Sequence, residues 1–222
     1  MTDKPETVPS IPGLRAAIVP VTPFEQNCTL IFDQTTKVGA VVDPGGDVPK
    51  ILAAIKQIGM KVEKIVLTHG HLDHVGGAAE LAKTLGVKVE GPHQDDEFLM
   101  QGVEAQCVSY GLTGMANATS DRWLTEGDTL TIAGNDFEIF HCPGHSPGSL
   151  VYFHRGQRFA LVGDVLFQGS IGRTDFPYGD HDALIKNIKT KLLPLGDDVA
   201  FICGHGQPSS FGAERESNPF IV

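Results

Sequence analysis

Residues 69–74 read His69-Gly-His71-Leu-Asp73-His74, which places four potential metal ligands within six positions of the 222-residue sequence. Imidazole nitrogens and carboxylate oxygens are ligands that zinc and other divalent transition metals accept. A cluster this dense is rarely produced by scattered surface histidines. The spacing therefore predicts a metal site, and the absence of cysteine from the segment is typical of a catalytic site rather than a structural one.

Three further candidates occupy equivalent positions along the chain. His145, Asp164 and His205 each follow a short apolar segment, and each comes directly after a glycine. Glycine permits a close approach of the backbone at such a point. Side chains that follow separate strands in this way meet where the strands end, so we predict that these three residues join residues 69–74 in one shared site.

The candidate ligands are five histidines and two aspartates: His69, His71, His74, His145, His205, Asp73 and Asp164. A zinc ion takes three or four protein ligands, so seven are too many for one ion and suit two ions that share a bridging carboxylate. We predict two divalent ions, with zinc as the first choice and iron or manganese as alternatives. Two ions lower the pKa of a bridging water and polarise a carbonyl group, which predicts metal-assisted hydrolysis.

Asp43 is the candidate to hold the ligand turn in place, because it follows the apolar residues 38–42. An aspartate in Asp-Pro-Gly-Gly is also an ordinary turn former, and the sequence leaves that alternative open. The four remaining histidines have positions typical of loops, strand ends or a first helical turn, and we do not expect them to bind metal. They are His93, His141, His154 and His181.

The elements that must position these residues are short. Apolar runs predict strands at residues 16–21, 28–32, 38–42, 64–68, 87–90, 130–132, 137–141, 150–153, 159–162 and 199–203. Helical spacing predicts helices at residues 48–58, 74–85, 95–101 and 180–193, and loops at 109–120 and 168–179. A meander followed by helix-flanked strands occurs twice, which indicates two sheets packed face to face with helices outside.

Composition excludes several classes of protein. The formal net charge is −10 and no run of Lys or Arg occurs, so we expect no nucleic-acid partner. No apolar stretch is long enough to span a membrane, and we expect no membrane association. The four cysteines are scattered and no signal peptide precedes them, which predicts reduced thiols in the cytoplasm. The length suits one domain, or at most two small ones, and we expect a monomer or a weak homo-oligomer.

The order of these ligands resembles the metallo-β-lactamase superfamily over nearly the whole chain. The resemblance implies an α+β fold, the four-layer αββα sandwich, as a single metallo-hydrolase domain over residues 1–222 with a polar tail at residues 1–14. It implies catalytic roles for the carboxylates Asp73 and Asp164, the latter as the bridge. It assigns His69, His71 and His145 to one metal, and Asp73, His74 and His205 to the other.

Residues 141–149 and 212–220 further resemble type II glyoxalase, the hydroxyacylglutathione hydrolase, in its short bacterial form. This implies attack of a metal-bridging hydroxide on S-D-lactoylglutathione, giving D-lactate and glutathione, in the detoxification of methylglyoxal. Longer members carry a C-terminal helical domain with basic residues for the glutathione carboxylates. Arg173 stands where the family places a cationic contact to glutathione, and an ion pair with Asp175 or Asp180 is the alternative.

Other activities remain open at this point. Zinc β-lactamases commonly carry cysteine where Asp164 stands, which argues against that activity. Residues 172–176, Gly-Arg-Thr-Asp-Phe, also resemble the persulfide dioxygenases, which use one mononuclear iron to oxidise glutathione persulfide. That is the alternative function. A lactonase or nuclease of the same superfamily and a non-catalytic metal-binding module are further alternatives.

Overall fold

The N-terminal half of the protein forms a five-stranded sheet in sequence order. This computed structural model describes residues 13–222. The first three strands are antiparallel, and the last two join in parallel. The strands are β1 (Leu14–Val21), β2 (Gln26–Asp33), β3 (Val38–Val42), β4 (Lys61–Val66) and β5 (Lys88–Glu90). The helices are α1 (Val48–Ile58), α2 (Leu72–Val75), α3 (Ala78–Leu85), the 3-10 turn η1 (Gln94–Asp96), α4 (Glu97–Met100) and α5 (Val103–Tyr110).

The C-terminal half forms a six-stranded sheet in the order β13-β12-β9-β8-β7-β6, and a short hairpin, β10-β11, stands apart from it. Only β9 and β12 pair in parallel in the six-stranded sheet. The strands are β6 (Thr129–Ile132), β7 (Asn135–His141), β8 (Leu150–His154), β9 (Phe159–Gly163), β10 (Leu166–Phe167), β11 (Ser170–Ile171), β12 (Ala200–Cys203) and β13 (Ser209–Ser210). The helical segments are η2 (Arg155–Gln157), α6 (His181–Asn187), the π turn η3 (Ile188–Leu192), η4 (Leu193–Leu195) and α7 (Phe211–Ser217).

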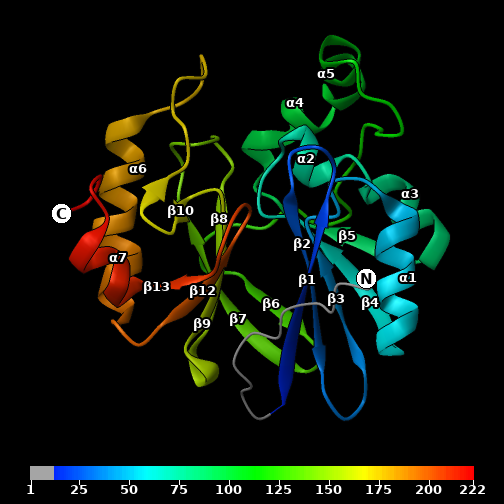
Figure 1. Ribbon diagram of the computed structural model, residues 1–222, viewed down its shortest axis with the longest axis horizontal. Coiled ribbons are helices and arrows are strands. Elements are labelled where there is room, and N and C mark those ends of the chain that lie inside the picture. Colours follow the sequence, from blue (N-terminus) through cyan, green and yellow to red (C-terminus); the bar gives the residue numbers. More distant parts are fainter. Residues whose placement is uncertain (1–12) are drawn as a thin grey trace, which may run out of the picture.

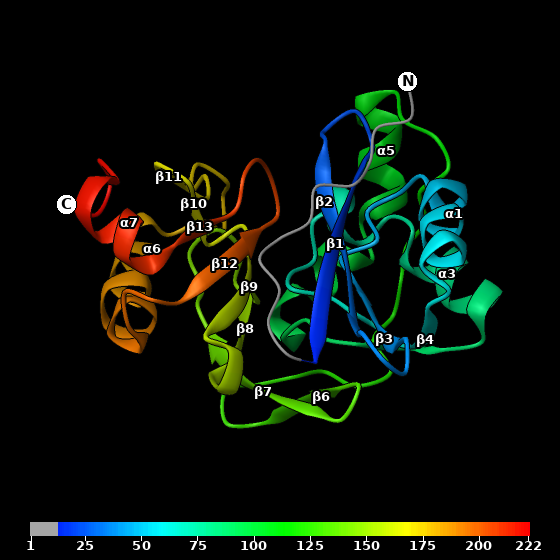
Figure 2. The ribbon, with the colours of Figure 1, turned by 60° about the horizontal axis from the view of Figure 1, so that its bottom comes forward.

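The two sheets face each other, and helices cover both outer faces (Figure 1). Figure 2 shows the layers side by side: α6 and α7, the sheet of β8, β9 and β12, the sheet of β1 to β4, and then α1 and α3. Three apolar clusters fill the spaces between these layers. In the central one, Ile31 and Val42 of one sheet pack with Phe137 and Leu161 of the other. The predicted α+β fold, an αββα sandwich, is confirmed.

Strand direction brings the predicted ligands to one rim. β3 and β4 are parallel, so their carboxyl ends lie at the same edge of the first sheet. β7 runs antiparallel to β8, which runs antiparallel to β9, and β9 is parallel to β12. The carboxyl ends of β7, β9 and β12 therefore share one edge of the second sheet. Every predicted strand is present, with ends that differ by a few residues.

The predicted continuous helix over residues 74–85 is wrong, because the chain breaks between α2 and α3 at Gly76 and Gly77. The Gly77 backbone N–H donates to the Pro44 carbonyl at 2.8 Å. A side chain at either glycine would collide with the carbonyl groups of Pro44 or Gly45. The break therefore lets the ligand turn lie directly against the loop that follows β3.

The predicted helix over residues 180–193 is also interrupted. It consists of α6, the π turn η3 and the 3-10 turn η4. Leu184, Ile188 and Leu192 are fully buried at intervals of four. A π turn has more residues per turn than an α-helix, so it keeps this spacing on one face. Asp180 begins the helix, because its side chain accepts a hydrogen bond from the Ala183 backbone N–H at 2.9 Å.

Three further predictions need correction or limits. The predicted loop over residues 109–120 overlaps the end of α5, and the loop at residues 168–179 contains the hairpin β10-β11. The predicted tail over residues 1–14 lies outside the described residues as far as position 12, and Leu14 is a buried residue of β1.

No helix within residues 13–222 combines the length and apolar character needed to cross a membrane. All four cysteines are free and buried.

Replacing Tyr152 with Phe tests the contact between the sheets. The Tyr152 hydroxyl on β8 donates to the Leu67 carbonyl just after β4 at 2.6 Å, and the side chain is fully buried. The variant leaves that carbonyl without its partner, so we expect the free energy of unfolding to fall by about 1–3 kcal/mol in a denaturant titration. Tyr110→Phe, at an exposed tyrosine, is the matched control and should change it by less than about 0.5 kcal/mol. Equal stability of the two variants would contradict the role of this hydrogen bond.

Candidate metal centre

The seven predicted ligand side chains lie together at the rim where β4, β7, β9 and β12 end. They include two trios in which one ligand atom of each residue lies within 4.8 Å of the others. The Nε2 atom of His69 is 3.1 Å from Nδ1 of His71. The Nε2 atom of His205 is 3.2 Å from an Asp73 carboxylate oxygen. The trios are His69, His71 and His145, and Asp73, His74 and His205.

Asp164 lies between the two trios and is buried. Its Oδ1 atom is 3.4 Å from Nε2 of His74, and its Oδ2 atom is 3.5 Å from Nε2 of both His145 and His205. Within residues 13–222, the buried atoms without a hydrogen-bond partner include His74 Nε2, His145 Nε2 and Asp164 Oδ1. Buried polar atoms normally have hydrogen-bond partners. These three atoms are nitrogen and oxygen ligands of the kind that divalent cations bind. The residues present therefore fit bound metal.

Backbone carbonyls fix the rings of two histidines. The Nδ1 atom of His145 is 2.9 Å from the Arg173 carbonyl oxygen, and Nδ1 of His205 is 3.1 Å from that of Phe24. A carbonyl oxygen only accepts, so each Nδ1 carries the proton and donates. The Nε2 atom of each ring then presents its lone pair to the centre, which is the form of imidazole that binds a metal.

Asp43 orients two more ligands from the end of β3. One carboxylate oxygen accepts from Nδ1 of His74 at 3.0 Å and from the Thr68 hydroxyl at 2.6 Å. The other accepts from the Thr68 backbone N–H at 2.7 Å. Because the Thr68 hydroxyl donates its only hydrogen to the bond with Asp43, its oxygen is left to accept a hydrogen bond from Nδ1 of His69 at 3.1 Å. Asp43 therefore holds the ligand turn through both the backbone and the side chain of Thr68.

The electrostatics of the cluster favour a cation. Burial lowers the pKa of His71 to about 3, with a further contribution from His145, so its imidazole is neutral at neutral pH as metal binding requires. Burial also opposes charge on His74, but Asp164 and Asp73 raise the pKa of His74 well above its usual value. In the described part of the chain, the ion-pair partners of Asp43, Asp73 and Asp164 are all histidines. No lysine or arginine there neutralises these carboxylates.

Asp96 is a buried residue that the sequence analysis missed. Its carboxylate accepts from the Gly70 backbone N–H at 2.8 Å, the Ser146 hydroxyl at 2.7 Å and the Gly148 backbone N–H at 2.6 Å. It therefore joins the loop that carries His69 to the loop that carries His145. Burial raises its pKa, although these hydrogen bonds oppose the shift. Asp96 lies in the polar stretch Gln-Asp-Asp-Glu at residues 94–97, which gives no signal of this role.

Arg173 lies on the exposed loop between β11 and α6, close to the centre. Its Nε and Nη2 atoms are 2.7 and 2.6 Å from the Asp175 carboxylate oxygens. The guanidinium lies 4.5 Å from the centroid of the Phe176 ring, which is 5.0 Å from that of His71. The ion pair with Asp175, one of the two alternatives raised by the sequence, is therefore present beside the candidate metal-binding histidines.

Two further groups also bring ligand atoms within 4.8 Å of one another: Asp43 with His69 and His74, inside the cluster, and His93, Asp95 and His141, apart from it. The rings of His93 and His141 are stacked at 4.2 Å with their planes only 13° apart, so their in-plane lone pairs run nearly parallel. Nε2 of His141 also lies 2.7 Å from the Pro147 carbonyl oxygen. These rings pack against each other and do not converge on a common point as the two trios do.

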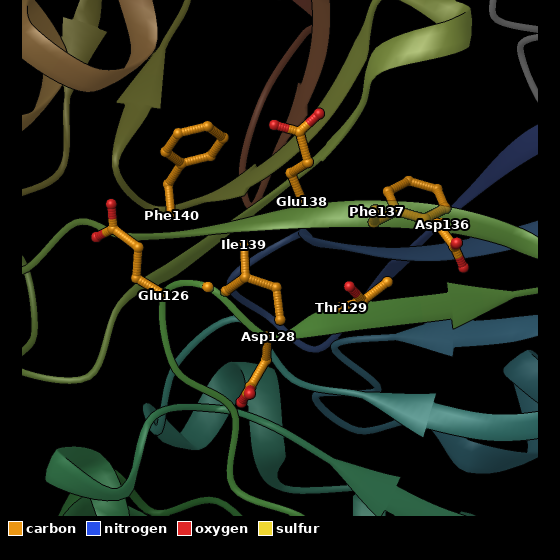
Figure 3. A pocket seen from close by; sticks show the side chains of 9 residues that line it. Glu126, Asp128, Thr129, Asp136, Phe137, Glu138, Ile139 and Phe140 are labelled. Carbon is orange, nitrogen blue, oxygen red and sulfur yellow. The ribbon is translucent and has the colours of Figure 1, made fainter.

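A cavity of about 410 Å³ lies along β6 and β7, and none of the seven predicted ligands lines it. Its lining mixes acidic residues with the apolar residues Phe137, Ile139 and Phe140, as Figure 3 shows. Glu126 pairs with Lys191 and Glu138 pairs with Arg155, each at 2.6 Å. The cavity is thus not the place where the predicted chemistry converges.

Comparison with known proteins assigns the family. Residues 21–205 match the metallo-β-lactamase superfamily. The chain belongs to this superfamily. It is 45% identical over 205 residues to the hydroxyacylglutathione hydrolase GloC of Haemophilus influenzae, covering 92% of this chain and 96% of that relative. The predicted resemblance is confirmed.

Two solved structures are similar to this chain over nearly their whole length. The BLEG-1 B3 metallo-β-lactamase superposes with a TM-score of 0.85 at 32% identity, covering 94% of this chain and 99% of that one. TTHA1623 in a di-iron-bound form has a TM-score of 0.81 at 33% identity, covering 91% and 98%. The fold alone therefore does not identify the reaction, because differently named proteins share it. The superfamily fold together with the His/Asp trios supports divalent metal binding.

Asp43→Asn tests the orientation of the ligand turn. Asparagine has the same size and tolerates the positive φ of 51° at this position, but its amide group replaces one accepting oxygen. We expect metal affinity to fall about 10- to 100-fold, measured by competition with a chromophoric chelator. The matched control is Asp47→Asn, which has a φ of 48° and should leave metal affinity unchanged. Wild-type affinity in the Asp43 variant would show that the aspartate only shapes a turn.

Asp96→Asn tests the link between the two ligand loops. The asparagine side chain would present an NH2 group, a donor, where the Asp96 carboxylate accepts from three donors. One of these buried donors would lose its acceptor, so we expect the free energy of unfolding to fall by about 1–3 kcal/mol. Asp95→Asn, at the exposed neighbouring residue, should change it by less than about 0.5 kcal/mol. Chemical denaturation of both variants under identical metal loading gives the comparison, and similar curves would argue against the link.

Proposed function

We propose that this protein is a metal-dependent thioester hydrolase of the hydroxyacylglutathione hydrolase type, converting S-D-lactoylglutathione to D-lactate and glutathione. The observation that carries the proposal is the convergence of five histidines and two aspartates at one centre, where His74 Nε2, His145 Nε2 and Asp164 Oδ1 are buried without a hydrogen-bond partner. The relative at 45% identity, which bears the name of this activity, supports the choice of substrate.

The ligand roles proposed for the two ions follow the trios. His69, His71 and His145 would hold one ion, and Asp73, His74 and His205 the other. Asp164 would bridge them, which its position between Nε2 of His74 and Nε2 of His145 supports. When bound, the ions lower the pKa of a coordinated water and polarise the thioester carbonyl. The chain contributes a fixed separation between the trios and neutral, oriented imidazoles.

Arg173 is proposed to bind a carboxylate of the glutathione group. The Nε and Nη2 atoms of its guanidinium already bind the Asp175 carboxylate as a bidentate pair, so a substrate carboxylate would replace Asp175 in the same geometry. The contact of Phe176 with both Arg173 and His71 supports a path from this group to the centre. We further propose a cytoplasmic location, which the free cysteines support, and a role in methylglyoxal detoxification, which would follow from the proposed substrate.

Thiol release from S-D-lactoylglutathione by the metal-loaded protein tests this function. His71→Ala removes a proposed metal ligand. We expect the kcat/KM of this variant to fall by more than the roughly 100-fold that is typical when a residue hydrogen-bonded to a metal ligand is lost. His181→Ala, the same substitution at the exposed first residue of α6, should retain wild-type activity. Equal rates for the two variants, or no thiol release by the wild type, would refute the proposal.

Parallel assays separate the alternatives. Oxygen uptake with glutathione persulfide in place of thiol release would establish the persulfide dioxygenase instead, and turnover of a β-lactam alone would establish a lactamase. Elemental analysis of protein purified without added metal should give two equivalents of a divalent metal per chain. We propose zinc, and the di-iron form of TTHA1623 makes iron the first alternative to examine. One equivalent of iron would contradict the dinuclear proposal.

A further inference from the structure

The two trios receive their outer hydrogen-bond partners from different parts of the chain. For the trio of Asp73, His74 and His205, the partners of the rings are Asp43 after β3, the Gln26 side chain at the start of β2 and the Phe24 carbonyl between β1 and β2. For the trio of His69, His71 and His145, two of the three partners come from the single loop between β11 and α6. These two are the Arg173 carbonyl, on His145, and the Tyr178 hydroxyl, on His71.

Tyr178 makes a direct contact with a proposed ligand. Its hydroxyl oxygen is 2.9 Å from Nε2 of His71. Its ring stacks on Phe176 with centroids 5.3 Å apart and an angle of 15°, and meets the edge of Phe98 at 5.4 Å. The aromatic contacts thus fix the ring of Tyr178, and the hydroxyl is the only polar atom of its side chain.

The hydroxyl differs chemically from the carbonyl and carboxylate partners. Those oxygens only accept, whereas a phenol, like the Thr68 hydroxyl beside His69, both donates and accepts. Nδ1 of His71 faces Nε2 of His69 at 3.1 Å, so it must present a lone pair if both atoms bind one ion. The proton of His71 then belongs on Nε2, where the Tyr178 oxygen accepts it. Without that oxygen, the proton on Nε2 has no partner and the form with the proton on Nδ1 is no longer disfavoured.

We propose that Tyr178 is a positioning residue that holds the His71 proton on Nε2 and thereby sets the affinity of the trio of His69, His71 and His145 for its ion. The inference rests on the proposed metal centre. Its consequence is an asymmetric centre: the loop between β11 and α6 controls one metal position, while the other depends on residues of the N-terminal sheet.

Tyr178→Phe tests this, because it removes the hydroxyl and keeps the stacked ring. Apo-protein is titrated with zinc against a chromophoric chelator. The wild type should bind two equivalents, and we expect the variant to bind one of them about 10- to 100-fold more weakly while the other stays within about twofold. In the zinc-loaded protein, ¹⁵N-edited NMR should detect a protected Nε2–H proton on His71 in the wild type and faster exchange of that proton in the variant.

Two controls separate the hydroxyl from other effects. Tyr110→Phe makes the same substitution at an exposed tyrosine, and Phe98→Leu disturbs the ring packing of Tyr178 while keeping its hydroxyl. Both should bind two equivalents with wild-type affinity. Unchanged affinity in Tyr178→Phe, equal weakening of both equivalents, or the same loss in Phe98→Leu would overturn the inference. Failure of the wild type to bind zinc, iron or manganese would instead overturn the proposed metal centre itself.

Discussion

The structure depends on a concentration of negative charge that no basic side chain neutralises. Asp43 and Asp164 are buried and Asp73 is mostly so, and in the described chain only histidines pair with them. Burying a carboxylate is costly unless a cation or several hydrogen-bond donors accompany it. The inner nitrogens of the histidines are turned toward the same point, so they cannot donate hydrogen bonds to Asp73 and Asp164 without giving up their lone pairs. Divalent ions resolve this conflict, which is why the fold and the metal site belong together.

The sandwich serves this centre by placing strand ends opposite one another. Each sheet contributes ligands at the carboxyl ends of strands that run in the same direction, and the central apolar cluster holds the two sheets face to face. Glycine is needed where ligand loops touch: a side chain at Gly204 would collide with the Asp164 carboxylate and the His74 ring. A rigid scaffold therefore ends in loops packed too closely to tolerate side chains, and this fixes the ligands within a narrow range of positions.

Behind the ligands lies a second set of contacts that controls proton positions. Four of the histidine rings donate a hydrogen bond to an outer acceptor: Asp43, Thr68 or one of two backbone carbonyls. The fifth ring, that of His71, contacts the Tyr178 hydroxyl. Each contact removes one of the two neutral forms of an imidazole. These partners come from both halves of the chain, and Asp43 links the two trios because it contacts His74 directly and His69 through Thr68.

The sequence alone predicted the general fold and the set of residues that converge at the rim. The candidate ligands His69, His71, Asp73 and His74 lie within six positions, and the others follow apolar strands after glycine, so local patterns were sufficient to propose them. Only the tertiary structure decided which partners orient them, where the helices break, and that Arg173 pairs with Asp175. The Tyr178–His71 contact spans 107 positions and the Asp96–Gly148 contact spans 52. Contacts between residues so far apart depend on how the layers pack, and no periodicity or motif in the intervening chain encodes them.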